Sequence, residues 1–154
     1  MLRVRKLHGW TLLELLAALT VSGVLATIAY GSYASIVERT KINQAIVDIA
    51  KIHSAIEKYR LNHANQPPPH LAEIGMALED PWGAPYEYLN FASLPGNSNG
   101  PVRKDHNLVP LNSKYDLFSK GPDGKSVSPL TAKASRDDII MANDGGYIGL
   151  AADY

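Results

Sequence analysis

The 154-residue chain contains no cysteine, so no disulfide bond can hold any part of it together. Small domains that work outside the cytoplasm often depend on disulfides for their stability. A domain of this sequence in such a compartment must be stabilised by other means, for example by packing or by a bound metal. The length leaves room for one modest soluble domain in addition to a long helix.

The chain also lacks an excess of either charge, since 15 Lys and Arg residues balance 15 Asp and Glu residues. This balance gives no support to nucleic-acid binding, which usually needs a basic surface. No Ser, His and Asp motif for nucleophilic catalysis is present, and no histidine pair has the spacing of metal ligands. The sequence therefore predicts neither an enzyme nor a histidine metal site. The five histidines are His8, His53, His63, His70 and His106.

What is present is an apolar segment of membrane length, residues 10–29, behind a short head with three cations. Gly9 ends the head, and Glu14 is the one charged residue of the apolar segment. About 20 apolar residues can span a bilayer, and a carboxylate inside such a span costs roughly 2.5–3.5 kcal/mol. A chain that keeps Glu14 at this place is expected to use it.

Two simple interpretations of this segment are a secretory signal peptide and a plain membrane anchor. A signal peptide has an apolar core of about 7–15 residues followed by a small-residue cleavage site, and the present segment is longer. A plain anchor accounts for the length of the segment but not for Glu14 near its start. Both interpretations therefore leave part of the pattern unexplained.

The apolar segment continues into an amphipathic helix. Beyond residue 34, isoleucines recur at steps of three and four, which is the period of one helical face. They are Ile42, Ile46, Ile49, Ile52 and Ile56. Residues 62–69, rich in asparagine and proline, then break the helix. The pattern predicts one helix over residues 11–61, whose first half must be buried by lipid or by neighbouring copies of the chain.

A turn and a short strand are expected after this helix. Residues 80–88 read DPWGAPYEY, which favours a turn with a buried aromatic side chain followed by a short strand. Residues 71–78, just before them, are expected to form a short helix. Trp82, Tyr86 and Tyr88 suit packing in a core better than a platform for a ligand.

The N-terminal pattern resembles the class III leader of the type IV pilin-like superfamily, with a basic head, Gly9, an aromatic residue, Thr11 and Glu14. Members of this superfamily are cut after the glycine by a prepilin peptidase, which also N-methylates the new first residue. That residue would be Trp10 here, where the family usually has phenylalanine. Removal of the leader would take three of the 15 cations and leave 12 beside 15 acidic side chains, a mildly acidic chain.

Two internal segments resemble the major pseudopilin of bacterial type II secretion systems. Residues 80–88 are similar to its Asp-Pro-Trp-Gly-x-Pro-Tyr segment, and residues 115–124, YDLFSKGPDG, are similar to its second strand and glycine-aspartate turn. The absence of cysteine points the same way, because many type IV pilins carry a C-terminal disulfide loop. The resemblance implies an α+β, pilin-like fold, in which the second half of a long N-terminal helix packs on a small antiparallel β-sheet. It also implies a leader over residues 1–9, a membrane-spanning and fibre-core helix over 10–33, and a periplasmic domain over 34–154.

Acidic residues near the C-terminus form the candidate metal site. The residues alone favour a solvated loop in which Asp137 or Asp138 caps a turn, since no EF-hand pattern is present. Major pseudopilins hold a structural calcium ion in this loop, and Asp123, Asp137 and Asp138 match the acidic ligands of that family in order. The resemblance therefore implies a calcium (Ca2+) site made by these side chains and the backbone carbonyl of Lys120, with Asp144 as a further candidate.

The resemblance implies a structural subunit and no enzymatic activity. A precursor in the bacterial inner membrane would be cut between Gly9 and Trp10 and would polymerise into a periplasmic fibre that drives protein export across the outer membrane. Glu14 would serve assembly by pairing with the N-terminal amine of a neighbouring subunit. The implied partners are further copies of the chain, the prepilin peptidase, minor pseudopilins, the inner-membrane assembly platform and the membrane, without nucleic acid.

Two alternatives stay open at this point. One is a type IV pilin or minor pilin that serves adhesion, motility or DNA uptake. The other is a membrane-anchored periplasmic binding domain, which would be neither cut at Gly9 nor polymerised.

Overall fold

The computed structural model of the protein describes residues 9–95 and 100–154. Most of the expected leader, residues 1–8, therefore lies outside the described residues. The chain divides into two compact units, Met1–Arg39 and Thr40–Tyr154. Helix α1 (Leu12–Asn62) contributes to both units, and its bounds confirm the helix predicted over residues 11–61. The two units are described separately below.

In the first unit, the side chains of α1 make almost no tertiary contacts. Most of its large apolar residues are exposed over more than half of their surface, for example Leu13 at 78% and Leu19 at 70%. By length and composition, α1 is a helix that can cross a membrane, and none of its apolar membrane-length stretch is buried within the structure. Its Ser and Thr hydroxyls donate to carbonyl oxygens of the same helix at 2.7–3.2 Å. These residues are Thr20, Ser22, Thr27, Ser32 and Ser35.

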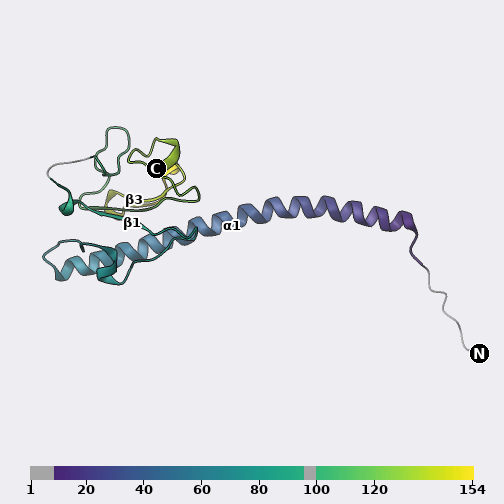
Figure 1. Ribbon diagram of the computed structural model, residues 1–154, viewed down its shortest axis with the longest axis horizontal. Helices are drawn as coiled ribbons and strands as arrows, with labels where there is room; N and C mark the ends of the chain where they lie inside the picture. Colours follow the sequence, from purple (N-terminus) through teal and green to yellow (C-terminus); the bar gives the residue numbers. More distant parts are fainter. Residues whose placement is uncertain (1–8, 96–99) are drawn as a thin grey trace, which may run out of the picture. The chain divides into compact units, whose positions relative to one another are not determined.

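The second unit contains a four-stranded antiparallel sheet in the order β1-β2-β3-β4. The strands are β1 (Glu87–Asn90), β2 (Tyr115–Ser119), β3 (Ile139–Ala142) and β4 (Tyr147–Leu150). The C-terminal part of α1 runs beside this sheet (Figure 1). The pilin-like α+β fold expected from the sequence is therefore confirmed. Strand β1 overlaps the end of the first segment that carried the resemblance and β2 lies within the second, whereas the sequence analysis did not predict β3 and β4.

Strand β3 is buried on both faces of the sheet, since its successive residues point to opposite sides and each side meets a cluster of apolar residues. Ile139 and Met141 of β3 face the core that holds Ile49, Ile52 and their neighbours on α1, all of them almost inaccessible to water. The alternate residue Ile140 packs in a second cluster on the other face. That cluster is completed by residues that lie outside the four strands or at their ends, namely Leu111, Leu130, Ala142 and Ala151.

Short segments connect these elements. The helix expected over residues 71–78 is a shorter 3-10 helix, η1 (Leu71–Ile74). The described residues contain four further 3-10 turns, η2 (Phe91–Ser93), η3 (Lys133–Ser135), η4 (Asn143–Gly145) and η5 (Ala151–Asp153).

The turn before β1 is organised by the buried carboxylate of Asp80. One oxygen of that carboxylate accepts from the backbone amides of Trp82 and Ala84, and the other accepts from the Ser119 hydroxyl of β2. Trp82 is partly buried and packs against the core, as expected. Asp80 therefore holds the turn against β2, and the turn brings Trp82 to the core.

Candidate functional site

Gly9 and Trp10 lie just before the first turn of α1. Trp10 is 73% exposed. A methyl group added at Gly9 would meet no atom within 4 Å. The peptide bond expected to be cut is therefore accessible, and the structure itself gives no steric reason for glycine at position 9.

Glu14 is held by Thr11 of its own chain. Its Oε2 accepts from the Thr11 backbone amide at 2.9 Å and from the Thr11 hydroxyl at 3.0 Å. In return, the Glu14 amide donates to the Thr11 hydroxyl oxygen at 3.2 Å. This reciprocal pattern is a capping box, in which a Thr and a Glu three residues later satisfy amides that the first helical turn leaves free.

The capping box was missed as a feature of the sequence, although its T-x-x-E pattern is visible there. It gives Glu14 a role that needs no neighbouring subunit. A carboxylate that accepts two hydrogen bonds at a helix N-terminus is also favoured by the helix dipole. The first turn therefore reduces the cost of placing this charge at the start of an apolar helix.

The acidic residues expected to bind calcium lie in two different environments. Asp138 is 0% exposed, and its Oδ2 forms an ion pair with the guanidinium of Arg103. The same oxygen accepts from the Ser126 hydroxyl at 2.6 Å. Burial raises the pKa of the Asp138 carboxyl to about 6, although Ser126 and Arg103 act in the opposite direction. Asp138 is thus a buried, ion-paired group at neutral pH.

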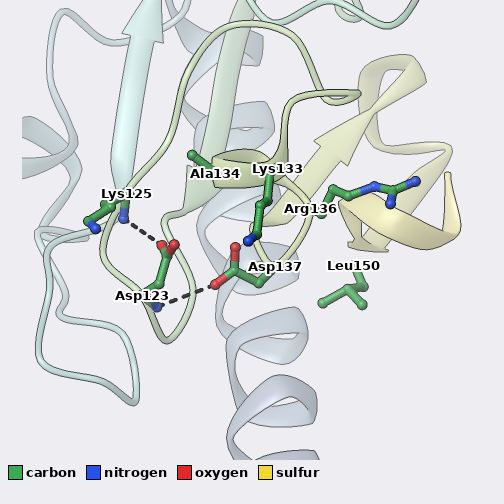
Figure 2. Close-up of a pocket in the computed structure, with 7 residues that line it drawn as sticks. All are labelled: Asp123, Lys125, Lys133, Ala134, Arg136, Asp137 and Leu150. Atoms are coloured by element: carbon green, nitrogen blue, oxygen red, sulfur yellow. Dashed lines mark hydrogen bonds between the residues drawn. The ribbon is translucent and has the colours of Figure 1, made fainter.

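Asp123 and Asp137 line an open surface depression together with Lys125, Lys133 and other residues (Figure 2). Asp137 Oδ2 accepts from the Asp123 backbone amide at 3.3 Å, and Asp123 Oδ1 accepts from the Lys125 amide at 2.7 Å. These bonds arrange the turn that follows β2. They use carboxylate oxygens that a metal would also need.

Neither of the two remaining candidates is shown to supply a ligand. Lys120 forms an ion pair through its side chain with Glu87. Asp144 accepts from the Ser113 amide at 2.7 Å, in a different part of the unit.

The donor set therefore does not fit a calcium site as it is arranged. Over residues 9–95 and 100–154, no three His, Asp or Glu side chains come together in a way that could hold a metal. Arg103 already neutralises the most buried of the three acids. The expected calcium ion stays a prediction.

Arg103 is the residue of this site that sequence reasoning missed. Its backbone amide donates to the buried carboxylate of Asp116 at 2.6 Å. Its guanidinium binds Asp138 and the carbonyl oxygen of Val127, and it lies 4.3 Å from the centre of the Phe118 ring. The partners are far apart in the sequence, so no local motif marks them.

His53 illustrates the structural use of a histidine in this chain. Its Nδ1 lies 2.7 Å from the Tyr115 hydroxyl of β2, which in turn donates to Glu57 at 3.2 Å. Burial raises the pKa of the Tyr115 hydroxyl above its ordinary value. The contact joins α1 to the sheet.

Comparisons with known proteins agree with the motifs. The chain is 27% identical over 138 residues to the type II secretion system core protein G of Pectobacterium carotovorum, covering 76% of this chain and 77% of that protein. It is 28% identical over 142 residues to the core protein G of Pseudomonas aeruginosa, covering 79% and 87% of the two chains. These similarities confirm the resemblance to type II secretion pseudopilins.

A pilin is also similar to the chain. The type IV major pilin protein PilE of Neisseria gonorrhoeae is 27% identical over 150 residues, which are 92% of this chain and 86% of that protein. No family model matches the chain, and the search of solved structures gave no significant match.

Proposed function

We propose that this protein is a structural subunit of a type II secretion pseudopilus. The carrying observation is the similarity to several core proteins G of type II secretion systems over about three quarters of the chain. The first half of α1 supports the proposal, because its apolar side chains are exposed and need lipid or neighbouring helices to cover them. The role is that of a building block, not of an enzyme.

The precursor is inserted in the inner membrane through α1, with residues 34–154 in the periplasm. A prepilin peptidase cuts the accessible bond between Gly9 and Trp10 and methylates the new amine. The exposed position of Gly9 and Trp10, ahead of the first helical turn, supports this assignment.

Polymerisation transfers the apolar part of α1 from lipid to a bundle of neighbouring α1 helices. The amine of Trp10 becomes a cation that needs a partner in an environment of low dielectric constant. The Glu14 carboxylate of an adjacent subunit is the partner we assign. Glu14 must then exchange or share its hydrogen bonds with Thr11, which are present within the single chain.

A type IV pilin is the second candidate function, favoured by the similarity to PilE over 92% of the chain. The two candidates share processing and polymerisation but differ in the place of action. A pseudopilus subunit works with minor pseudopilins and an inner-membrane assembly platform to export proteins. A pilin subunit forms a fibre on the cell surface.

Two measurements test the proposal. The first is N-terminal sequencing of the protein recovered from membranes, which should begin at a methylated Trp10. A chain that still begins at Met1 would favour a membrane-anchored binding domain. The second is deletion of the gene, which should block release of exported proteins into the medium and leave surface fibres intact. Loss of surface fibres with normal export would favour the pilin.

A further inference from the structure

Arg103 is the one lysine or arginine that is buried in the part of the chain that the structure describes. Its side chain is 4% exposed. A buried cation is costly unless charges and hydrogen bonds compensate it. The surroundings of Arg103 provide this compensation and also show which segments it joins.

The guanidinium binds oxygen atoms from two parts of the loop over residues 120–138. Within the first half of the loop it donates to the Ser126 hydroxyl and to the Val127 carbonyl oxygen, the latter at 2.7 Å. At the end of the loop it binds the carboxylate of Asp138. Ser126 also donates to Asp138, so the three partners form one connected group.

The Arg103 guanidinium therefore joins the two parts of this loop. Beneath the guanidinium lies the ring of Phe118, which anchors it to β2. A second bond pair, from the Val127 amide to the Ser135 hydroxyl oxygen and from that hydroxyl to the Val127 carbonyl, supports the same closure. With no cysteine in the chain, no disulfide contributes.

We propose that Arg103 is the resident cation of the loop over residues 120–138, so that this domain folds without calcium. The guanidinium binds a carboxylate, a hydroxyl and a carbonyl, which are all oxygen ligands of the kind that a calcium ion collects. A calcium ion at the same carboxylate would be repelled by the neighbouring guanidinium. The proposal concerns the fold of the second unit and holds whether or not the chain forms a fibre.

Two buried atoms of the ion pair have no hydrogen-bond partner of their own in the described part of the chain. Asp138 Oδ1 and Arg103 Nε are both buried and have no hydrogen-bond partner among the described atoms. Removal of Arg103 would leave the Asp138 carboxylate buried without a counter-charge. Such a change is strongly destabilising, more than the loss of an exposed ion pair.

The proposal and the calcium expectation make opposite predictions for the full-length protein in detergent micelles. We expect the wild-type protein, stripped with EDTA, to contain no calcium by elemental analysis and to bind none in equilibrium dialysis with radioactive calcium. Its melting temperature, followed by the near-ultraviolet circular dichroism of its aromatic residues, should be the same in EDTA and in excess calcium chloride. One retained ion per chain, or a melting temperature lowered by EDTA, would overturn the proposal.

Variants test the role of Arg103 directly. Arg103→Met should lower the melting temperature by at least several degrees, and addition of Asp138→Asn should recover part of the loss, because the unpaired charge is then removed. The matched control is Arg136→Met, which removes an exposed cation from the same loop and should leave the melting temperature unchanged. Equal melting temperatures of the wild type and Arg103→Met would contradict the proposal. If Arg103→Met does not fold, the calcium measurements on the wild type still decide.

Discussion

Glu14 has hydrogen-bond partners before any other subunit is present. Its bonds to Thr11 stabilise the first turn of α1, so two functions are combined in one carboxylate. One is capping within the chain, which needs oxygen acceptors. The other is the proposed pairing with an amine, which needs negative charge. Substitutions that separate acceptors from charge can therefore distinguish these functions.

Glu14→Ala and Glu14→Gln form such a pair. Both variants remove a charge from the apolar segment, so both should insert in the membrane at least as well as the wild type. Neither should form fibres, because the neighbouring amine is left without a counter-charge. Electron microscopy of fibres and fractionation of membranes measure the two effects. Fibres of normal length from Glu14→Gln would show that capping, and not charge, is the function of this residue.

Gly9→Val is expected to block processing. A branched side chain beside the scissile bond would prevent close approach of a peptidase to the backbone, which glycine allows. The uncut protein should run on a gel about nine residues heavier than the mature chain, as counted from the proposed cleavage position. Gly9→Ala, with the smallest side chain, is the control and should be cut more than Gly9→Val. Complete processing of Gly9→Val would refute the leader assignment.

The pKa of Asp138 leads to a prediction for the pH dependence of stability. Burial raises this pKa from 3.8 to about 6. Between these values the folded protein holds a proton that the unfolded chain has released. The contribution of Asp138 to the free energy of unfolding therefore rises as the pH falls through this window, and it decreases as the pH rises through it.

Urea unfolding near pH 7 and near pH 5 measures this contribution. The free energy of unfolding of the wild type, minus that of Asp138→Asn, should be larger near pH 5 than near pH 7, because Asn binds no proton. The comparison of the two variants cancels the titration of exposed groups. A difference that is independent of pH, or that grows toward pH 7, would show that the folded-state pKa of Asp138 is not raised.

At the scale of the element, the turn after β2 depends on one glycine. Gly121 has φ +63, and a Cβ atom at this position would overlap the carbonyl oxygen of Asp137. Gly124, three residues later, has φ +66 but nothing within 4 Å of such an atom. An alanine would strain the backbone at either position, but only at Gly121 would its Cβ also collide with another residue.

Gly121→Ala should therefore cost more stability than Gly124→Ala. The positive φ alone costs roughly 1 kcal/mol for an alanine at either site, and Gly121→Ala adds the displacement of the loop near Asp137. Urea unfolding of the two variants gives the difference directly. Equal losses would show that the backbone at Asp137 moves away without cost.

The strands show which elements the sequence reveals and why. Strands β1 and β2 lie in segments with turn residues and recognisable motifs, so they could be predicted. All four residues of β3 (Ile139–Ala142) are buried, because this strand is covered on both faces, and such a strand lacks the alternation that marks a half-buried one. Strand β4 is short and lies at the sheet edge, and it too was missed.

In the candidate site too, contacts between residues close in the sequence could be predicted, and contacts between distant residues could not. The Thr11 and Glu14 capping box is a local pattern and could have been found from sequence. Arg103 and Asp138 are 35 residues apart, and their pairing depends on how the loop returns to β2. No spacing rule could have indicated that an arginine would lie where the resemblance implied a metal ion.

At the scale of the whole molecule, the chain divides at Arg39 and Thr40. The second unit contains the buried face of α1 and the whole sheet, and so it holds its own core. A protein that begins at Thr40 should therefore be folded, soluble and monomeric. Circular dichroism and gel filtration measure this outcome, and the full-length chain in water is the control, which should aggregate. An unfolded Thr40 protein would show that the first unit is needed for folding.

The hydroxyl groups along the first half of α1 have a consequence for how such helices can associate. Each of the five Ser and Thr side chains described above is bonded to a carbonyl oxygen of its own turn. A hydroxyl engaged in this way has used its one donor, so it can take part in a hydrogen bond to another helix only as an acceptor. Packing between these segments in the proposed filament would then rest mainly on dispersion forces. In the filament that we propose, a subunit would then be added or turned with few polar bonds broken inside the bundle, apart from the proposed pairing at Glu14.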